Sequence, residues 1–237
     1  MNIKKIYTLS YSNILNPPPH LYKLDVHLDF TDQGVHVKYN KLFLNREDFS
    51  EEELEDEGFS LHDDIQIDSA LSKNWAAYFK QLTDLSKWSN DKPSENIGNT
   101  LSLYTSDDAS VKYFTVNKIE YLLEEIYQAI LESAKIEAPL SLHLKKVQNG
   151  SETALELIWH FKDRLFEVVT NNKKTGKTWE EGQQLLGLFY ETDLAELPVY
   201  KKKLPEGSIC INPGDGLWYE TPKDNNWQKL MDSVFAS

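Results

Sequence analysis

The sequence predicts an α+β fold made mainly of antiparallel sheets, with hairpins and a three-stranded meander packed by three amphipathic helices. Two long segments alternate apolar and polar residues, as half-buried antiparallel strands do. Three other segments carry apolar residues at spacings of three and four, as amphipathic helices do. The two kinds of segment do not alternate regularly along the chain, which argues against a doubly wound parallel sheet.

Length and composition allow one or two domains. The chain has 237 residues, of which 40% are hydrophobic and 27% are charged, as in an ordinary folded protein. We expect a single α+β domain over residues 1–237, with a subdivision into 1–90 and 100–237 as the alternative. The polar residues 89–100, which include a proline and a glycine, would then be the linker.

The clearest strand pair comprises residues 21–30 and 35–44. Pairing Phe30 with Val35 places the apolar residues of both strands on one face and the polar residues on the other. A shift of one residue would place Lys38 on the apolar face, so the pattern selects its own register. The apolar face predicted in this way contains Tyr22, Leu24, Val26, Leu28, Phe30, Val35, Val37 and Tyr39.

A second antiparallel unit, the three-stranded meander, is predicted over residues 140–170. Turns near 148–151 and 162–163 bring large apolar residues of the three strands onto a shared face. Two shorter strands are expected over 207–212 and 217–221, around a Pro-Gly-Asp-Gly turn. The register pairs expected in the meander are Leu140 with Trp159, Leu142 with Leu157, Leu144 with Leu155, Trp159 with Phe166 and Leu157 with Val168.

Three amphipathic helices are predicted from apolar stripes with helical spacing. The first lies between Asp68 and Trp88, and the second begins at Asn117, whose side chain can cap the helix together with Glu120. The third lies at the C-terminus. The stripes consist of Leu71, Trp75, Phe79, Leu82 and Leu85 in the first helix, Ile119, Leu122, Leu123, Ile126, Ile130 and Ala134 in the second, and Trp227, Leu230, Met231, Val234 and Phe235 in the third.

Residues 47–64 contain ten carboxylates and no Lys or Arg, against a net charge of -13 for the whole chain. Such a run is usually a disordered loop, but its local sequence predicts an ordered helix over 51–57. Ser50 and Glu53 have the spacing of a capping box, with hydrophobic residues placed to form a staple beside it. Gly58 can take the left-handed conformation that ends a helix.

This acidic segment has three interpretations. It is a solvated helix that keeps the protein soluble, a docking surface for a basic protein partner, or a cation site, although its spacing lacks the order of an EF-hand loop. The side chains of the docking surface would be Glu51, Glu52, Glu53, Glu55, Asp56 and Glu57.

Basic residues elsewhere in the chain are a second potential partner for the acidic segment. They can pair with it within one molecule or between two copies, which makes a homo-oligomer a further expectation, and such pairing would weaken with salt. These residues are Lys162, Arg164, Lys173, Lys174, Lys177, Lys201, Lys202 and Lys203.

Two histidines of the first hairpin suggest a further candidate metal site. His27 and His36 fall on the polar face, diagonal to one another, and Asp29 lies beside them. Two histidines and a carboxylate are a common metal-binding set, but a diagonal pair is wider than the ideal spacing. A solvent-facing polar surface is the favoured interpretation, and we expect no metal or other cofactor.

No motif identifies an enzyme. Gly176-Lys177-Thr178 lacks the further glycine of a phosphate-binding loop, because Asn171 occupies that position, and residues 171–176 are expected to form a hairpin turn. Cys210 lies between two isoleucines in a predicted strand, as a buried structural cysteine does. No serine lies in a G-x-S-x-G elbow. Whether the protein is an enzyme therefore stays open at the level of the sequence.

Charge and cysteine content bound the location and the partners. The net charge of -13 repels nucleic acid. No stretch approaches the ~20 apolar residues of a membrane span, and the N-terminal residues lack the apolar run of a secretory signal. A single cysteine fits a reducing cytoplasm. We therefore expect a cytoplasmic binding or regulatory module that contacts a protein partner through its acidic surface, with a metal- or small-molecule-dependent enzyme as the alternative.

Overall fold

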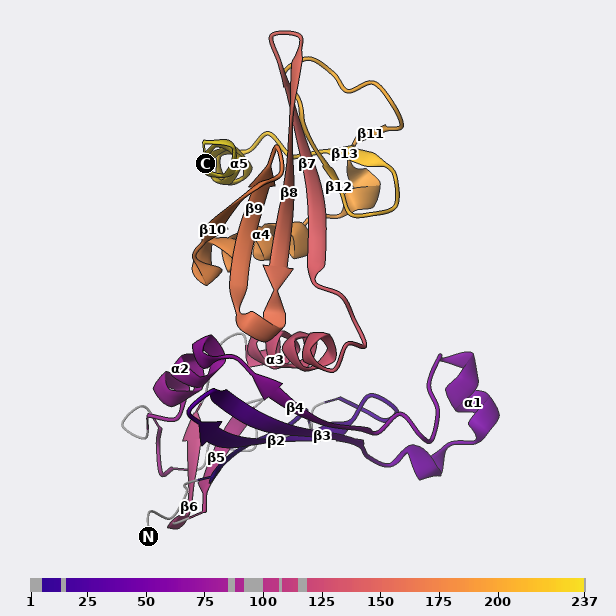
Figure 1. The fold of residues 1–237 in the computed structure, drawn as a ribbon. Coiled ribbons are helices and arrows are strands. Elements are labelled where there is room, and N and C mark those ends of the chain that lie inside the picture. The colour runs from indigo at the N-terminus through magenta and orange to yellow at the C-terminus, as the bar shows by residue number, and fades with distance from the viewer. Residues whose placement is uncertain are drawn as a thin grey trace. The chain divides into compact units, whose positions relative to one another are not determined.

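Two antiparallel sheets, each with its own helices, make up the structure (Figure 1). The computed structural model describes residues 6–13, 16–84, 88–91, 100–106, 108–114 and 119–236. It contains two compact units, Met1–Glu137 and Ala138–Ser237. The α+β class and the antiparallel pairing that the periodicity predicts are confirmed.

The N-terminal unit is built on a six-stranded sheet with the order β4-β3-β2-β1-β5-β6. Helices α2 and α3 lie on one face of this sheet (Figure 1). Helix α1 lies beyond the edge of the sheet at which β3 ends. The strands are β1 (Ile6–Ser12), β2 (Tyr22–Thr31), β3 (Gly34–Phe43), β4 (Ile65–Leu71), β5 (Thr100–Thr105) and β6 (Asp108–Phe114). The helices are the 3₁₀ turn η1 (Arg46–Asp48), α1 (Glu51–Asp56), α2 (Lys73–Leu82) and α3 (Ile119–Ser133).

The apolar face of the first hairpin forms the centre of the N-terminal core. Phe30 pairs with Val35 in the predicted register, and the turn between the strands is closed by Thr31 and Gly34. Because a one-residue slip would bring charged side chains into this core, burial holds the register in place. The fully or nearly fully buried residues of this core include Leu9, Leu24, Val26, Leu28, Val37, Trp75, Phe79, Leu101, Leu103, Ile126 and Ile130.

The C-terminal unit is built on a seven-stranded sheet with the order β10-β9-β8-β7-β12-β13-β11. Its strands are β7 (Leu140–Gln148), β8 (Ser151–His160), β9 (Leu165–Thr170), β10 (Lys173–Lys177), β11 (Val199–Tyr200), β12 (Ile209–Asn212) and β13 (Trp218–Glu220). Its helices are α4 (Trp179–Glu191) and α5 (Asn225–Phe235), with 3₁₀ turns η3 (Phe161–Asp163) and η4 (Leu194–Glu196). All five predicted register pairs of the meander are confirmed, as are the two short strands, here β12 and β13.

Helix α4 is not among the predicted helices. Thr178 caps it and forms a complete capping box with Glu181. The helix packs closely on the sheet because Gly182 has no side chain, and the Nε1 atom of Trp159 donates to the Gly182 carbonyl at 3.0 Å. The Thr-x-x-Glu spacing was the available signal for this helix.

The predicted helix between Asp68 and Trp88 is wrong in its first turn. Residues 68–71 belong to β4, where Leu71 pairs with Val35 on β3. Helix α2 begins only after Ser72, and its buried residues Trp75 and Phe79 are those of the predicted stripe. The spacing of Leu71 to Trp75 fits a helix, but the pairing of Leu71 across the sheet overrides that local pattern. The predicted stripe residue Leu85 lies outside the described residues.

The other two predicted helices are present as α3 and α5. In α5, Asp224 caps the first turn, and Trp227, Met231 and Val234 are buried. The cap predicted at Asn117 lies outside the described residues.

The linker predicted over 89–100 lies inside the N-terminal unit. Ser89 forms a β-bridge with Tyr113, and β5, which begins at Thr100, pairs with β1. Residues 92–99 lie outside the described residues. The boundary between the two compact units instead falls in the sequence between Glu137 and Ala138. A compact unit is not by itself an independently folding domain, so the expectation of a single domain stays a prediction.

Candidate functional site

Residues 47–64, between β3 and β4, form an ordered structure that we call the acidic lobe. Its helix α1 begins with the predicted capping box: the Ser50 hydroxyl accepts from the Glu53 N–H at 3.3 Å, and the Glu53 carboxylate accepts from the Ser50 N–H at 2.9 Å. The backbone and hydroxyl bonds from Ser50 lower the pKa of Glu53, because they stabilise its charged form. The first end of the helix is therefore fixed by its own sequence.

The second end of α1 is fixed by a Schellman motif. Gly58 has φ +80°, and its N–H donates to the Glu55 carbonyl at 2.9 Å. The N–H of Phe59 donates to the Leu54 carbonyl at 2.8 Å. The side chain of Leu54 is 1% exposed, so the helix is anchored by a buried residue as well as capped.

Arg46 holds the base of the acidic lobe. Its Nε atom donates to the Pro19 carbonyl at 3.0 Å, and its Nη1 atom donates to the Ser60 carbonyl at 2.6 Å and also to the Asp63 carboxylate. Because Pro19 precedes β2 and Ser60 follows α1, these bonds join the lobe to the loop before β2 through a single side chain. Charge-assisted bonds of this kind are about twice as strong as neutral ones.

Aromatic rings enclose the same guanidinium. The Cζ atom of Arg46 lies 3.7 Å from the ring centroid of Phe43 and 4.9 Å from that of Phe59. The ring of Phe59 in turn packs edge-on against His20, with the ring centroids 5.0 Å apart. The rings shield the guanidinium from water and add cation–π attraction to its hydrogen bonds. Arg46 is consequently 3% exposed although it is charged.

The acidic residues at the end of the lobe also have defined roles. Asp63 accepts from the backbone and hydroxyl of Ser60 at 2.8 and 2.7 Å, and Asp64 accepts from the Phe43 N–H at 2.8 Å. Burial acts to raise the pKa of Asp63, but the bonds from Ser60 and Arg46 outweigh it and hold that pKa below its ordinary value. Asp63 and Asp64 thus tie the lobe to the end of β3.

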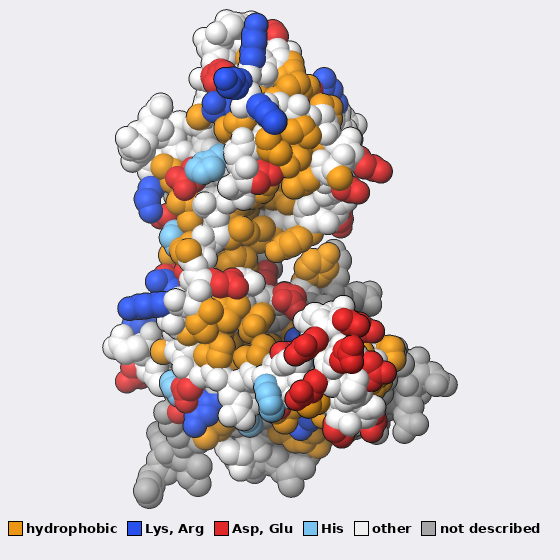
Figure 2. Space-filling view, turned by 90° about the vertical axis from the view of Figure 1, so that its right-hand side faces the viewer, with side chains coloured by type: hydrophobic (Ala, Val, Ile, Leu, Met, Phe, Trp, Pro, Cys, Tyr) orange, Lys and Arg blue, Asp and Glu red, His pale blue; other side chains and the backbone are white. Residues whose placement is uncertain are grey.

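Seven other carboxylates of the acidic lobe are exposed and take no part in this framework. Among the described residues, none of them forms an ion pair. Figure 2 shows acidic side chains gathered over this part of the N-terminal unit. They are Glu47, Asp48, Glu51, Glu52, Glu55, Asp56 and Glu57. Five of the six predicted docking residues are in this set, whereas the sixth, Glu53, serves as part of the cap.

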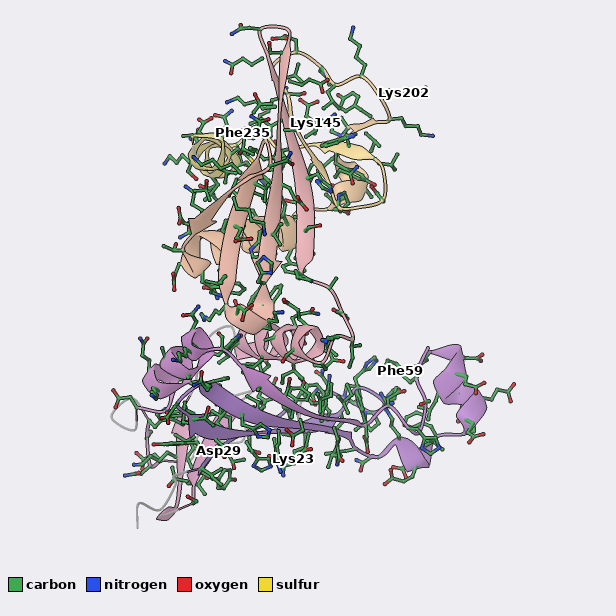
Figure 3. The ribbon with its side chains drawn as sticks, in the orientation of Figure 1. Lys23, Asp29, Phe59, Lys145, Lys202 and Phe235 are labelled. Atoms are coloured by element: carbon green, nitrogen blue, oxygen red, sulfur yellow. The ribbon has the colours of Figure 1, made fainter. Side chains whose placement is uncertain are left out.

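The predicted metal ligands lie on the other side of the N-terminal sheet. Figure 3 shows Lys23 and Asp29 on the face turned away from α2 and α3, which we call the open face. There Asp29 and His36 are direct register partners. The Nδ1 atom of His27 lies 2.9 Å from the Thr8 hydroxyl.

The polar residues of the open face pair mainly with one another. The Nε2 atom of His36 lies 2.5 Å from Asp68, and Lys23 pairs with Asp25 at 2.8 Å. Among the described residues, no group of three His, Cys, Asp or Glu side chains is placed to hold a metal ion. The two histidines therefore have different partners rather than a shared one.

The basic residues predicted as partners of the acidic segment all lie in the C-terminal unit. Lys174 pairs with Glu167 at 2.9 Å, and Arg164 is 9% exposed beside the ring of Trp179. Lys201–Lys203 are all exposed, on the loop between β11 and β12, where Figure 3 labels Lys202. Among the described residues, this loop holds the only run of three consecutive exposed lysines.

The other sequence features have structural roles. The hairpin turn expected over 171–176 is present but shorter: Asn171 and Asn172, both with positive φ, form the turn, residues 173–177 form β10, and Thr178 caps α4. Cys210 is fully buried, and burial raises the pKa of its thiol. No helix among the described residues has the length and apolar character needed to cross a bilayer.

Two residues near the acidic lobe were missed at the level of the sequence. Arg46 directly precedes the acidic run, so a lone cation beside ten carboxylates was the available signal. Lys41 occupies an apolar-face position of β3, where a charged residue breaks the alternation.

The chain matches no protein-family model, no curated protein and no solved structure.

Proposed function

We propose that this chain is a binding module that contacts a basic protein partner through the exposed carboxylates of the acidic lobe. The observation that supports this most is how the lobe is held. Its helix is capped at both ends, Leu54 anchors it, and Arg46 joins its base to the preceding loop. A surface that is already ordered loses little conformational entropy on binding.

The arrangement of charge supports the same proposal. Glu51 and Glu55 are four residues apart on one helix, where a like-charged pair costs about 0.2–0.5 kcal/mol. The lobe therefore holds its carboxylates together against their repulsion, and Lys or Arg side chains of a partner would relieve it. Exposed charges of one sign also steer an oppositely charged partner, in a manner that salt weakens.

A metal- or small-molecule-dependent enzyme is the alternative proposal. His27 and His36 would be its metal ligands, but each has another partner on the open face. We also place the protein in a reducing cytoplasm, because its single cysteine is buried and unpaired. Its net charge of -13 favours a basic protein over nucleic acid as the partner.

The test compares the wild-type chain with two variants of equal charge. In the lobe variant, glutamine replaces Glu51, Glu52, Glu55 and Glu57. In the control variant, glutamine replaces Glu137, Glu180, Glu191 and Glu196, which are exposed and lie outside the acidic lobe. Glu53 is unchanged in both, because its carboxylate closes the capping box.

Each immobilised version is incubated with a cytoplasmic extract at low and at physiological ionic strength, and the retained proteins are quantified. We expect basic proteins that the wild type and the control variant retain and that the lobe variant loses. Equal retention by all three versions would contradict the proposal.

Native mass spectrometry of the same versions tests whether the basic partner is a second copy of the chain. The result expected for a second copy is a dimer that dissociates as salt rises and that the lobe variant does not form. Lys201–Lys203 would then provide the basic surface.

A further inference from the structure

Strand β4 forms one edge of the N-terminal sheet. It has seven residues, Ile65–Leu71, and pairs with β3 on one side only. The strand contains no Lys, Arg or Pro, and its one charged side chain, Asp68, pairs with His36 at 2.5 Å. Proteins usually block an exposed edge of this length, because its backbone groups can pair with a strand of another chain.

The two edges of the C-terminal sheet are blocked in common ways. Strand β10 carries Lys173, Lys174 and Lys177, and strand β11 is only two residues long. Lysines and short strands both discourage pairing with another chain. Strand β4 is longer than either of these strands and has no lysine, so it lacks both kinds of protection.

A hydrogen bond from α3 shows which backbone groups of β4 point away from the sheet. The Ser133 hydroxyl donates to the Ala70 carbonyl at 2.9 Å, so this carbonyl points away from β3. Because successive residues of a strand bond alternately to its two sides, the N–H groups of Gln66, Asp68 and Ala70 also point outward. All three residues are exposed, and among the described residues none accepts a hydrogen bond from these N–H groups. The outer side of β4 can therefore accept a further strand.

The surroundings of this edge favour a partner that is both apolar and basic. Ile65 and Ile67 are half-buried on the face that α3 covers, where apolar side chains of an added strand can pack beside them. The acidic lobe directly precedes β4, and Figure 1 shows α1 beyond the end of the sheet at which β4 begins. An added strand that continues past Ile65 therefore approaches the exposed carboxylates of the lobe.

We propose that the basic partner binds as an extended segment, which pairs with β4 and places its lysines or arginines against the acidic lobe. Main-chain hydrogen bonds to Gln66, Asp68 and Ala70 hold the segment. Its alternate apolar side chains pack beside Ile65 and Ile67, and the carboxylates of the lobe select a segment with a basic end.

The direction of β4 gives the polarity of the bound segment. Strand β4 begins beside the lobe, so a segment that pairs with it in the antiparallel sense has its basic residues at its own C-terminal end. Antiparallel pairing is slightly the more stable of the two arrangements. This inference rests on the proposed function and adds to it the conformation in which the partner binds.

The test uses the full chain and two synthetic peptides of equal charge. The strand probe has five alternating threonine and valine residues followed by four lysines. The flexible probe has five alternating glycine and serine residues followed by the same four lysines. Fluorescence anisotropy measures the affinity of each probe for the wild type and for the lobe variant. We expect the wild type to bind the strand probe about tenfold more tightly than the flexible probe, and the lobe variant to bind both more weakly.

Hydrogen exchange followed by NMR shows whether the bound probe lies along β4. In the free chain, the N–H groups of Ile67 and Ser69, which point toward β3, should exchange slowly, and those of Gln66 and Asp68 should exchange fast. Saturation with the strand probe should slow exchange at Gln66 and Asp68 at least about tenfold. Exchange at these two residues that stays fast with the probe bound would overturn the inference.

A matched pair of variants tests the main-chain bond itself. Gln66→Pro removes an outward N–H and no bond to β3, whereas Gln66→Ala removes the same side chain and keeps the N–H. The proline variant should lose most of the preference for the strand probe, and the alanine variant should keep it. Circular dichroism checks that both are folded, and the exchange measurement on the wild type does not depend on either variant.

The two proposals fail in different ways. If the wild type binds both probes equally and the lobe variant binds both more weakly, the pairing with β4 is wrong and the proposed function stands. If the wild type binds neither probe more tightly than the lobe variant does, the proposed function is contradicted, and this inference with it.

Discussion

The Nη1 atom of Arg46 donates a hydrogen bond to the carboxylate of Asp63, 17 residues later, and so closes the base of the acidic lobe. The Arg46 side chain is 4% exposed and that of Asp63 is 35% exposed, so the pair links the interior to the surface. A single buried cation thereby supports a lobe that carries ten carboxylates. The stability and the pH response of the lobe should both depend on this pair.

Replacing Arg46 should loosen the lobe even when the charge is kept. In Arg46→Lys, one ammonium cannot serve Pro19, Ser60 and Asp63 at once, and it does not stack on a ring as a guanidinium does. We expect the free energy of unfolding to fall by about 2–3 kcal/mol, because buried carbonyl groups lose their donors. Urea denaturation measures this change.

The control for that experiment is Lys23→Met. Lys23 is 49% exposed and pairs with Asp25 at the surface, so its loss should cost less than about 1 kcal/mol. Equal effects of the two substitutions would show that Arg46 is not the support described here.

The ion pair also predicts how stability responds to acid. The pKa of Asp63 is lower in the folded protein than in the unfolded chain, where it is near 3.9. Its contribution is complete above that unfolded value and is lost as the pH falls through the lower folded value, because the unfolded chain takes up the proton first.

Asp63→Asn should therefore flatten the decline of stability below about pH 4. Thermal unfolding of both chains between pH 2.5 and 6 measures this decline. Parallel curves would mean that Asp63 does not contribute. The carboxylate of Glu124, whose side chain is exposed, provides the comparison through Glu124→Gln.

Two glycines of helix α4 should respond in opposite ways to alanine. At Gly182 a Cβ atom would lie 2.8 Å from Trp159 Nε1 and 2.9 Å from Phe166 Cγ, so Gly182→Ala should lower the free energy of unfolding by about 1–3 kcal/mol. At Gly187 a Cβ atom would meet nothing within 4 Å, so Gly187→Ala should raise it by about 0.5–1 kcal/mol. Changes of the same sign would contradict the close packing of α4 on the sheet.

Local patterns predicted those parts of the fold in which each residue's role depends on its near neighbours. The pairing of Phe30 with Val35 follows from the alternation of the hairpin, since any slip buries charge. The helix of the acidic lobe follows from Ser50, Glu53 and Gly58, which satisfy its end groups within a few residues. The candidate docking carboxylates could therefore be predicted without coordinates.

Contacts between distant residues could not be predicted in the same way. Leu71 has the spacing of a helical stripe, but it pairs with Val35 because β3 has a free edge that β4 occupies. β1 lies between β2 and β5 in the sheet, although β5 begins only at Thr100. Only the folded chain shows which strand lies beside which.

The sequence by itself determined the fold class, the hairpin registers and the ordered acidic helix, because alternation and capping act over a few residues. Only the tertiary structure decided that Arg46 supports the acidic lobe and that the Lys41 amine lies beside the rings of Tyr22 and Phe43. Both roles depend on burial, and burial arises from segments far apart in the chain that pack together. From the sequence alone, a charged residue is expected to be exposed. Its surroundings in the folded protein decide its partners and its pKa.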